Sequence, residues 1–278
     1  MFINKKKGGE LTTVKTINRV YAHYHEALTL FPENKIIGIF VSGSQNYGLA
    51  DENSDVDTKL IITPSINDFV FNRSPVSSTH ILENNEHIEI KDIRLMFNCY
   101  KKQNINFIET LFTNYYILNP IYEDIFSPLM NNENIPRYDE EATLYCVKGM
   151  IETNYRQLAG TRTQRPEIVE KFGYNPKKLD NILRLQEFAQ SYINGATYLE
   201  CIHSICHEYH KKIKREKIDD IKLVYDLAEK AQLSTNQLIN NYFASHKLTK
   251  NKEVEKLLDE TQYKLIKKSL ELEGVNFI

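Results

Sequence analysis

The chain has 278 residues and a formal net charge of −2, so it has room for one large domain or two modest ones and should have no strong overall attraction to nucleic acid. Hydrophobic residues make up 41% and charged residues 26%, which is ordinary for a globular protein, and no apolar run approaches the ~20 residues of a membrane helix. The four cysteines are scattered and no signal peptide precedes them. We therefore expect a protein of the reducing cytoplasm with no membrane partner, and composition leaves its oligomeric state open.

The chain opens with a predicted helix and two predicted strands. Residues 11–30 carry apolar side chains at a 3.6-residue period, which predicts a helix. Residues 35–41 form an apolar, β-branched run that predicts a buried strand ending at Gly43-Ser44. Asp55-Val56-Asp57 follows about ten residues later and leads into a second apolar run, 60–62, which Pro64 ends.

The two aspartates are placed unusually for a strand, where Asp is depleted. At positions i and i+2 they point to the same face, and two carboxylates so close repel each other unless a cation lies between them. Hard divalent cations such as Mg²⁺ prefer oxygen clusters of this kind. Gly43 lets the backbone approach a ligand closely, and a turn that presents free N–H groups favours phosphate. The pattern predicts a triphosphate at 43–48 and metal at Asp55 and Asp57.

The order of strand, Gly-Ser, spacer and Asp-x-Asp resembles the DNA polymerase β-like nucleotidyltransferase superfamily. Within it, GSQNYGLADENSDVDTK is most similar to predicted bacterial and phage nucleotidyltransferases related to the RNA-ligase-associated group, through Tyr47-Gly48 and Ser54-Asp55-Val56-Asp57. The resemblance covers the first half well and the second half loosely. It implies an α+β fold, a small mixed sheet with flanking helices, followed by an all-α bundle.

The resemblance also implies an activity: transfer of a nucleoside monophosphate from an NTP to an acceptor hydroxyl, with two Mg²⁺ ions (or Mn²⁺) as cofactors. Gly43, Ser44 and Tyr47 would contact the nucleotide. The acceptor is left open between an RNA 3′ end, in repair or tailing, a protein hydroxyl, as in antitoxin-like adenylyltransferases, and a small molecule. The alternative from another class is a non-catalytic NTP- or RNA-binding module. Both aspartates are present, which favours the enzyme.

Members of the superfamily carry a third carboxylate on a neighbouring strand. Residues 79–82 and 86–91 predict two strands, and in the second Ile88 and Ile90 share one face while Glu89 lies on the other. Glu89 is therefore our candidate for third metal ligand or general base, with a solvated strand glutamate as its alternative. Asp92 is the second candidate for this third carboxylate; it stands before a predicted helix, 93–102, and an N-cap role suffices to explain it, which favours Glu89.

The remainder of the chain is predicted to be helical. Residues 93–102 and 105–112 are apolar and should cover the sheet, and a loop-rich passage from Asn119 to Pro136 predicts a domain boundary. We expect a catalytic domain over 1–135 and a helical domain over 136–278. The helices expected there are 142–158, 179–193, 198–214, 218–231, 235–245 and 253–272, with a basic linker over 159–178.

Two groups in the second half carry possible chemistry. Gly173-Tyr174, Lys177 and Arg184-Leu185 match a pattern of the resembling group, although Asn181 replaces its usual His; Lys177 and Arg184 are expected to contact phosphate, with a solvated basic face as the alternative. His203, Cys206, His207 and His210 would share one helix face and could hold zinc, but buried cysteine beside exposed histidine is the commoner arrangement.

Overall fold

A five-stranded mixed sheet forms the centre of the first half of the chain in the computed structural model, which describes residues 10–51, 54–160 and 166–277. Its strand order is β3-β4-β2-β1-β5. The strands are β1 Ile36–Ser42, β2 Asp57–Ile62, β3 Ser77–Ile81, β4 His87–Asp92 and β5 Tyr116–Leu118. β2 and β4 run parallel and the other neighbours are antiparallel. The expected α+β class and mixed sheet are confirmed.

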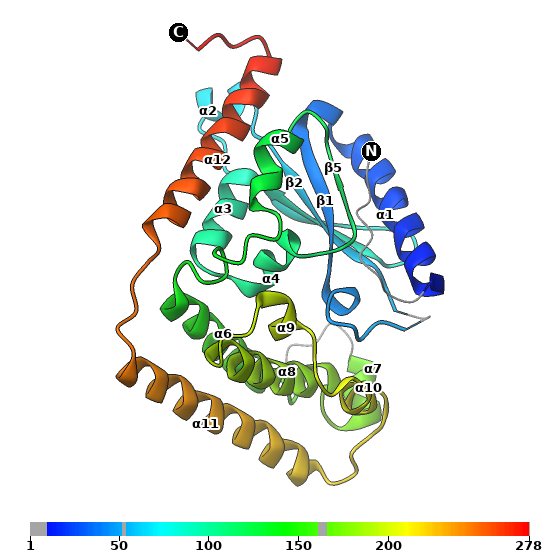
Figure 1. The fold of residues 1–278 in the computed structure, drawn as a ribbon. Helices are drawn as coiled ribbons and strands as arrows, with labels where there is room; N and C mark the ends of the chain where they lie inside the picture. Colours follow the sequence, from blue (N-terminus) through cyan, green and yellow to red (C-terminus); the bar gives the residue numbers. More distant parts are fainter. Residues whose placement is uncertain (1–9, 52–53, 161–165, 278) are drawn as a thin grey trace. The chain divides into compact units, whose positions relative to one another are not determined.

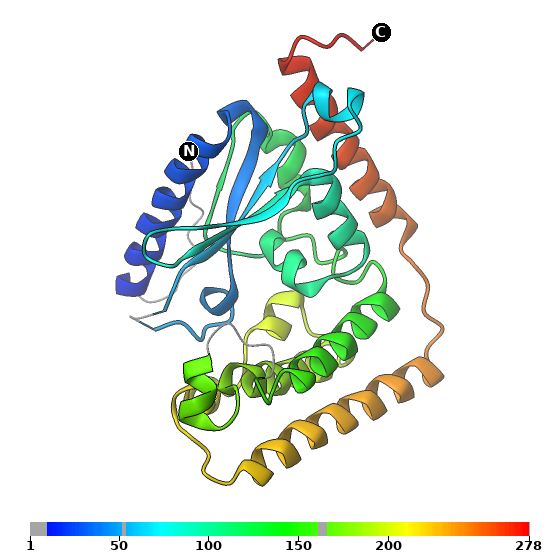
Figure 2. The same ribbon diagram turned by 180° about the vertical axis from the view of Figure 1, so that it is seen from behind.

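Helices cover both faces of this sheet (Figures 1 and 2). On one face, α1 (Glu10–Leu30) contributes Val20 and Tyr24 to a buried apolar cluster that also contains Leu60 and Ile88. α3 (Ile93–Lys101), α4 (Ile105–Ile108) and α5 (Glu123–Phe126) lie on the other, where Phe126 packs on Phe40 with ring centroids 5.5 Å apart. β1 is buried at all seven positions because both of its faces are covered, which explains its uninterrupted apolar sequence.

The chain separates by its internal contacts into two compact units. The first comprises Met1–Asn46, Ala50–Tyr138 and Lys250–Ile278, and the second comprises Tyr47–Leu49 and Asp139–Thr249. The change after Tyr138 lies three residues from the boundary expected at 135/136. The last helix, α12 (Lys252–Leu272), groups with the first unit, where Ser269 lies 2.6 Å from the Thr63 hydroxyl and Glu273 pairs with Lys35.

The second unit is helical, as expected. It contains α6 Glu140–Arg156, α7 Pro166–Phe172, α8 Pro176–Ile193, α9 Tyr198–Ile202, α10 His207–Arg215 and α11 Ile221–Ser245. Within the described parts of the chain, no helix has both the length and the apolar character needed to cross a membrane.

Three local predictions were wrong, and one strand was missed. The expected helix 198–214 breaks between α9 and α10, where the Ser204 hydroxyl accepts the Cys206 N–H and so replaces a helical bond. The expected pair 218–231 and 235–245 is the single helix α11, because Thr235 bonds Ala231 within the helix instead of starting a new one. The expected linker contains α7, which Pro166 begins. Strand β5 was missed because it has only three residues.

Candidate active site

The Gly-Ser turn leaves the buried strand β1 directly. Gly43 has φ +81°, a left-handed conformation that favours glycine, and starts the 3₁₀ turn Gly43–Gln45. A Cβ at this position would meet no atom within 4 Å, so the conformation, and not crowding, calls for glycine. Asn46 fixes the turn to the strand, since its side-chain amide donates to the Val41 carbonyl (2.9 Å) and its Oδ1 accepts from Thr113 (2.7 Å).

The Asp-x-Asp segment lies at the same end of the sheet as this turn. Ser42, the last residue of β1, pairs with Asp57, the first of β2. Asp55 is exposed, and the Asp57 side chain is 45% exposed. The backbone N–H of His87 donates to Asp57 Oδ1 (3.1 Å), and His87 Nδ1 lies 3.4 Å from that oxygen. The structure thus brings Gly43, Asp55 and Asp57 to one end of strands β1 and β2, with the two carboxylates open to solvent.

Glu89 has partners that the sequence did not reveal. The burial of β4 alternates, so Ile88 and Ile90 face the core and Glu89 lies on the other face, about a third exposed. It pairs with Lys91 and with Lys59 on the neighbouring strand, each at 3.4 Å. Asp92 caps α3, accepting the Arg94 N–H (2.8 Å) and pairing with its guanidinium.

Two buried charges beside Glu89 were also missed. Lys59 is 7% exposed and lies 3.5 Å from the carboxylate of Glu109, which is 2% exposed and accepts the Gly43 N–H at 3.3 Å. In the sequence, the only sign of either residue is a charge at an apolar run: Lys59 directly precedes the run 60–62, and Glu109 lies within the run 105–112. Lys59 and Glu109 thereby link the second strand to the Gly-Ser turn.

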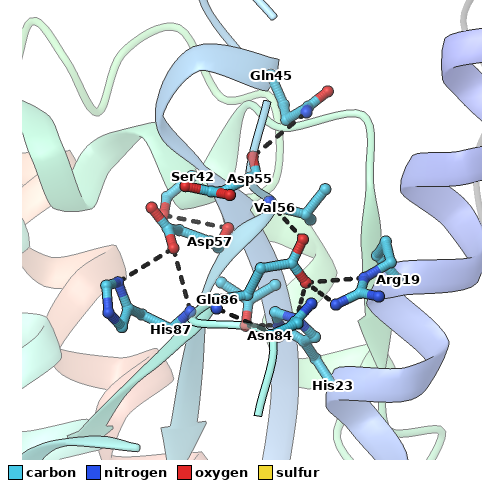
Figure 3. Close-up of polar contacts among 11 residues, drawn as sticks. Arg19, His23, Ser42, Gln45, Asp55, Val56, Asp57, Asn84, Glu86 and His87 are labelled. Atoms are coloured by element: carbon cyan, nitrogen blue, oxygen red, sulfur yellow. Dashed lines mark hydrogen bonds and ion pairs between the residues drawn. The ribbon is translucent and has the colours of Figure 1, made fainter. Parts of the chain in front are cut away.

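A third buried charge, Glu86, lies beside Val56, the residue between the two aspartates (Figure 3). Its carboxylate accepts from the Val56 N–H (3.0 Å), Arg19 Nε (2.8 Å) and His23 Nε2 (2.9 Å). Burial lowers the pKa of His23, although Glu86 opposes that effect. A neutral His23 therefore donates to Glu86 and accepts from Thr58, whose hydroxyl lies 2.9 Å from Nδ1.

The second unit holds Tyr47, Arg184 and Lys177. The Arg184 guanidinium lies over the Tyr47 ring, 3.7 Å from its centroid, in a cation–π contact. Arg184 Nε is buried and has no hydrogen-bond partner among the described residues. Lys177 is exposed in the first turn of α8. The structure therefore joins two of the expected nucleotide contacts, Tyr47 and Arg184, within one unit.

The group of His203, Cys206, His207 and His210 in the second unit does not form a zinc site. His203 follows the last residue of α9 and Cys206 precedes α10, so the four residues do not share one helix. His210 instead lies between the carboxylates of Asp180 (2.7 Å) and Glu187 (3.0 Å). Among the residues that the structure describes, no three or more His, Cys, Asp or Glu side chains are arranged to hold a metal, and this includes the trio of Asp55, Asp57 and Glu89.

No family model and no curated protein matches this chain. Among solved structures, it is similar to a nucleotidyltransferase-like protein from Exiguobacterium sibiricum 255-15, with 12% identity and a TM-score of 0.29 over 82% of this chain and 74% of that one. It is also similar to the E. coli MS115-1 CdnC:HORMA-deltaN complex, with 12% identity and a TM-score of 0.20 over 82% of this chain and 88% of that one. At these TM-scores neither likeness decides the function, which has to be inferred from the residues.

Proposed function

We propose that this protein is a nucleotidyltransferase that moves a nucleoside monophosphate from an NTP to an acceptor hydroxyl and releases pyrophosphate. One observation carries the proposal: the positive-φ turn at Gly43 and the solvent-open acids Asp55 and Asp57 lie at one end of two paired strands, with Ser42 opposite Asp57. A phosphate-binding turn beside two carboxylates suits a reaction that depends on positioning and on neutralising charge.

The donor set fits magnesium. Mg²⁺ keeps several waters and is usually bound by one or two carboxylates together with substrate phosphates, so it does not need a closed cage of protein ligands. Asp55 and Asp57 supply two hard oxygen donors that are open to solvent. When bound, Mg²⁺ or Mn²⁺ would neutralise the triphosphate and lower the pKa of the attacking hydroxyl.

The chain's own residues have distinct roles in this proposal. Ser44 and the neighbouring backbone N–H groups bind the terminal phosphates. The acceptor oxygen bonds to the α-phosphorus while the bond to the β-phosphate oxygen breaks. The hydroxyl proton passes to Glu89, whose carboxylate is about a third exposed and is held by Lys59 and Lys91.

The acceptor divides the proposal into alternatives: an RNA 3′ end first, a protein hydroxyl second, and a small molecule third. The protein should be incubated with each α-³²P-labelled NTP, Mg²⁺ and either total RNA or protein extract. We expect label in one of the macromolecular fractions and none with an Asp55→Asn/Asp57→Asn double variant. Label in neither fraction, with NTP binding retained, would favour a small-molecule acceptor or the non-catalytic binding module.

Gly43→Ala and Ser44→Ala test the phosphate-binding turn. Forcing a side chain into the left-handed region costs about 1–2 kcal/mol, and Gly43→Ala should also weaken NTP binding by displacing the turn. Ser44→Ala removes a hydrogen bond to a charged group, about 1.5–3 kcal/mol, so the Kd for NTP should rise roughly 10- to 100-fold. Isothermal titration calorimetry measures the Kd for NTP of both variants.

Gly195→Ala is the matched control for that experiment. Gly195 also has positive φ (+85°) and open space around its Cβ position, so it carries the same backbone cost in the second unit. It should lower stability like Gly43→Ala and leave NTP affinity unchanged. Unaltered affinity in both Gly43→Ala and Ser44→Ala would mean that the phosphates bind elsewhere.

Glu89→Gln should separate catalysis from structure. Gln keeps the shape of the side chain, and Lys59 keeps Glu109 as a partner, so we expect a folded protein with a modestly lower melting temperature and a transfer rate lower by roughly 10²-fold, the range for losing a general base. Asp92→Ser is the comparison, because Ser also caps helices, and transfer should be largely kept. An active Glu89→Gln protein and a stable but inactive Asp92→Ser protein would identify Asp92 as the third carboxylate.

A further inference from the structure

The two aspartates lie on either side of a backbone group that Glu86 holds. Asp55 and Asp57 flank Val56, and the Val56 N–H donates to Glu86 Oε1 at 3.0 Å (Figure 3). Glu86 precedes β4 and is only 4% exposed. A buried carboxylate is costly unless each oxygen has a partner, so its placement beneath the Asp-x-Asp segment calls for an explanation.

The Glu86 carboxylate is itself fixed from several directions. Its second oxygen, Oε2, accepts from Arg19 Nε (2.8 Å) and lies 2.9 Å from His23 Nε2, both on α1. The other ring nitrogen of His23 contacts the Thr58 hydroxyl on β2, and the Glu86 backbone N–H donates to Asn84 Oδ1 (3.2 Å). The acid is therefore held between helix α1 and the start of β2.

The next residue along the chain completes the arrangement. The His87 N–H donates to the Asp57 carboxylate at 3.1 Å, so residues 86 and 87 together hold the backbone between the aspartates and one of their side chains. The carboxylate of Asp55 is exposed, and its direction depends on the backbone at Val56. Groups that orient metal-binding side chains typically change metal affinity or activity by about 10- to 100-fold when removed.

We propose that Glu86 is a positioning residue for the Asp55 and Asp57 carboxylates, acting through its hydrogen bond to the Val56 N–H. This inference rests on the proposed function, since it assumes that the two acids bind a divalent cation with the nucleotide. Arg19 and His23 hold the Glu86 carboxylate in the orientation that receives Val56.

The test uses the full-length protein with Mn²⁺ as the probe. Glu86→Ala should raise the Kd for Mn²⁺, measured by electron paramagnetic resonance, about 10- to 100-fold. Hydrogen exchange at the Val56 amide should become at least about tenfold faster, because the amide loses its acceptor. Glu86→Gln should rescue both quantities to within a few-fold of wild type. An amide oxygen can still accept from Val56, Arg19, about a third exposed, turns to solvent, and His23 takes its other tautomer, so that Nε2 accepts from the amide and Nδ1–H donates to Thr58.

Glu26→Gln is the matched control. Glu26 also lies on α1 and also contacts a histidine of the sheet, with Oε1 2.9 Å from His80 Nε2 on β3, away from the segment 55–57. Mn²⁺ affinity and Val56 exchange should both stay at wild-type values. A change as large as that in Glu86→Ala would mean that any loss of a helix-to-sheet contact disturbs the site.

Three results would overturn the inference: a folded Glu86→Ala protein with wild-type Mn²⁺ affinity, a wild-type protein that binds no Mn²⁺, or Glu86→Gln as impaired as Glu86→Ala. In the last case the charge pair with α1 would matter and not the bond to Val56. Failure of the proposed function is a separate observation. A wild-type protein that transfers no nucleotide but binds Mn²⁺ in a Glu86-dependent way would refute the activity and keep the positioning role.

Discussion

Asp57→Asn and Asp55→Asn are each expected to reduce nucleotidyl transfer on the order of 10³-fold while leaving the fold intact. Losing a carboxylate that neutralises charge in the transition state forfeits several kcal/mol, and each 1.36 kcal/mol is a factor of ten in rate. In Asp57→Asn the side-chain amide retains an oxygen that can accept the His87 N–H, so β2 should remain paired with β4. Single-turnover transfer and thermal unfolding measure the two effects separately.

Asp124→Asn controls for the loss of one negative charge. Asp124 is exposed in the first turn of α5, in the same unit as the aspartates, and belongs to neither the Gly-Ser turn nor the Asp-x-Asp segment. Its replacement should leave transfer unchanged within about twofold, because exposed charges far from a site are largely screened. If both Asp55→Asn and Asp57→Asn transferred nucleotide at the wild-type rate, the enzyme would use a different site.

Local sequence patterns were sufficient for the elements that surround this site. β1 is a buried, largely apolar strand that ends before Gly43, and the apolar half of β2, residues 60–62, ends before Pro64; such boundaries depend on neighbouring residues alone. The division of α11 failed because Gln232-Leu233-Ser234 looks like a weak break, whereas Thr235 satisfies its hydroxyl on the preceding turn and the helix continues. Helix breaks at polar residues depend on where their side chains bond, which spacing does not show.

The residues of the candidate site also fall into a group that the sequence predicts and a group that it does not. Gly43, Asp55 and Asp57 could be predicted because they are close in the sequence and their spacing has chemical meaning. Glu86 could not, since it reaches Val56 only because β4 pairs in parallel with β2. Lys59 lies two residues from Asp57, but its partners Glu89 and Glu109 are distant in the sequence. Periodicity shows which face of a strand a residue occupies but not which strand lies beside it.

The other large effect concerns His210, in the core of the second unit. His210 and Asp180 are fully buried, and the imidazole bonds Asp180 on one side and Glu187 on the other. Burial alone would lower the pKa of His210, but the hydrogen bonds and charges of the two carboxylates outweigh it and raise the pKa to about 9. The ring is therefore an imidazolium at neutral pH, joining α8 to α10.

His210→Gln should lower the free energy of unfolding by about 3–5 kcal/mol, because it leaves two carboxylates facing each other without the cation between them. A folded-state pKa above the unfolded value of 6.5 gives stability that is complete below about pH 6.5 and is lost as the pH rises through about 9. The urea midpoint of the wild type should decline over that range, and the variant should lose the decline. Hydrogen exchange of the α8 and α10 amides at one fixed pH locates the effect in this unit.

Lys214 also has to be considered in interpreting the pH dependence, because its Nζ lies 3.3 Å from Asp180 Oδ2. Burial lowers its pKa, so its contribution to stability rises with pH, opposite in sign to that of His210. An alkaline decline in the wild type must therefore come from a group whose pKa is raised. His246→Gln, which removes an exposed histidine of the same unit, should keep both the stability and the decline. If His210→Gln kept the decline as well, the decline would come from another group, and His210 would not be the imidazolium that joins α8 to α10.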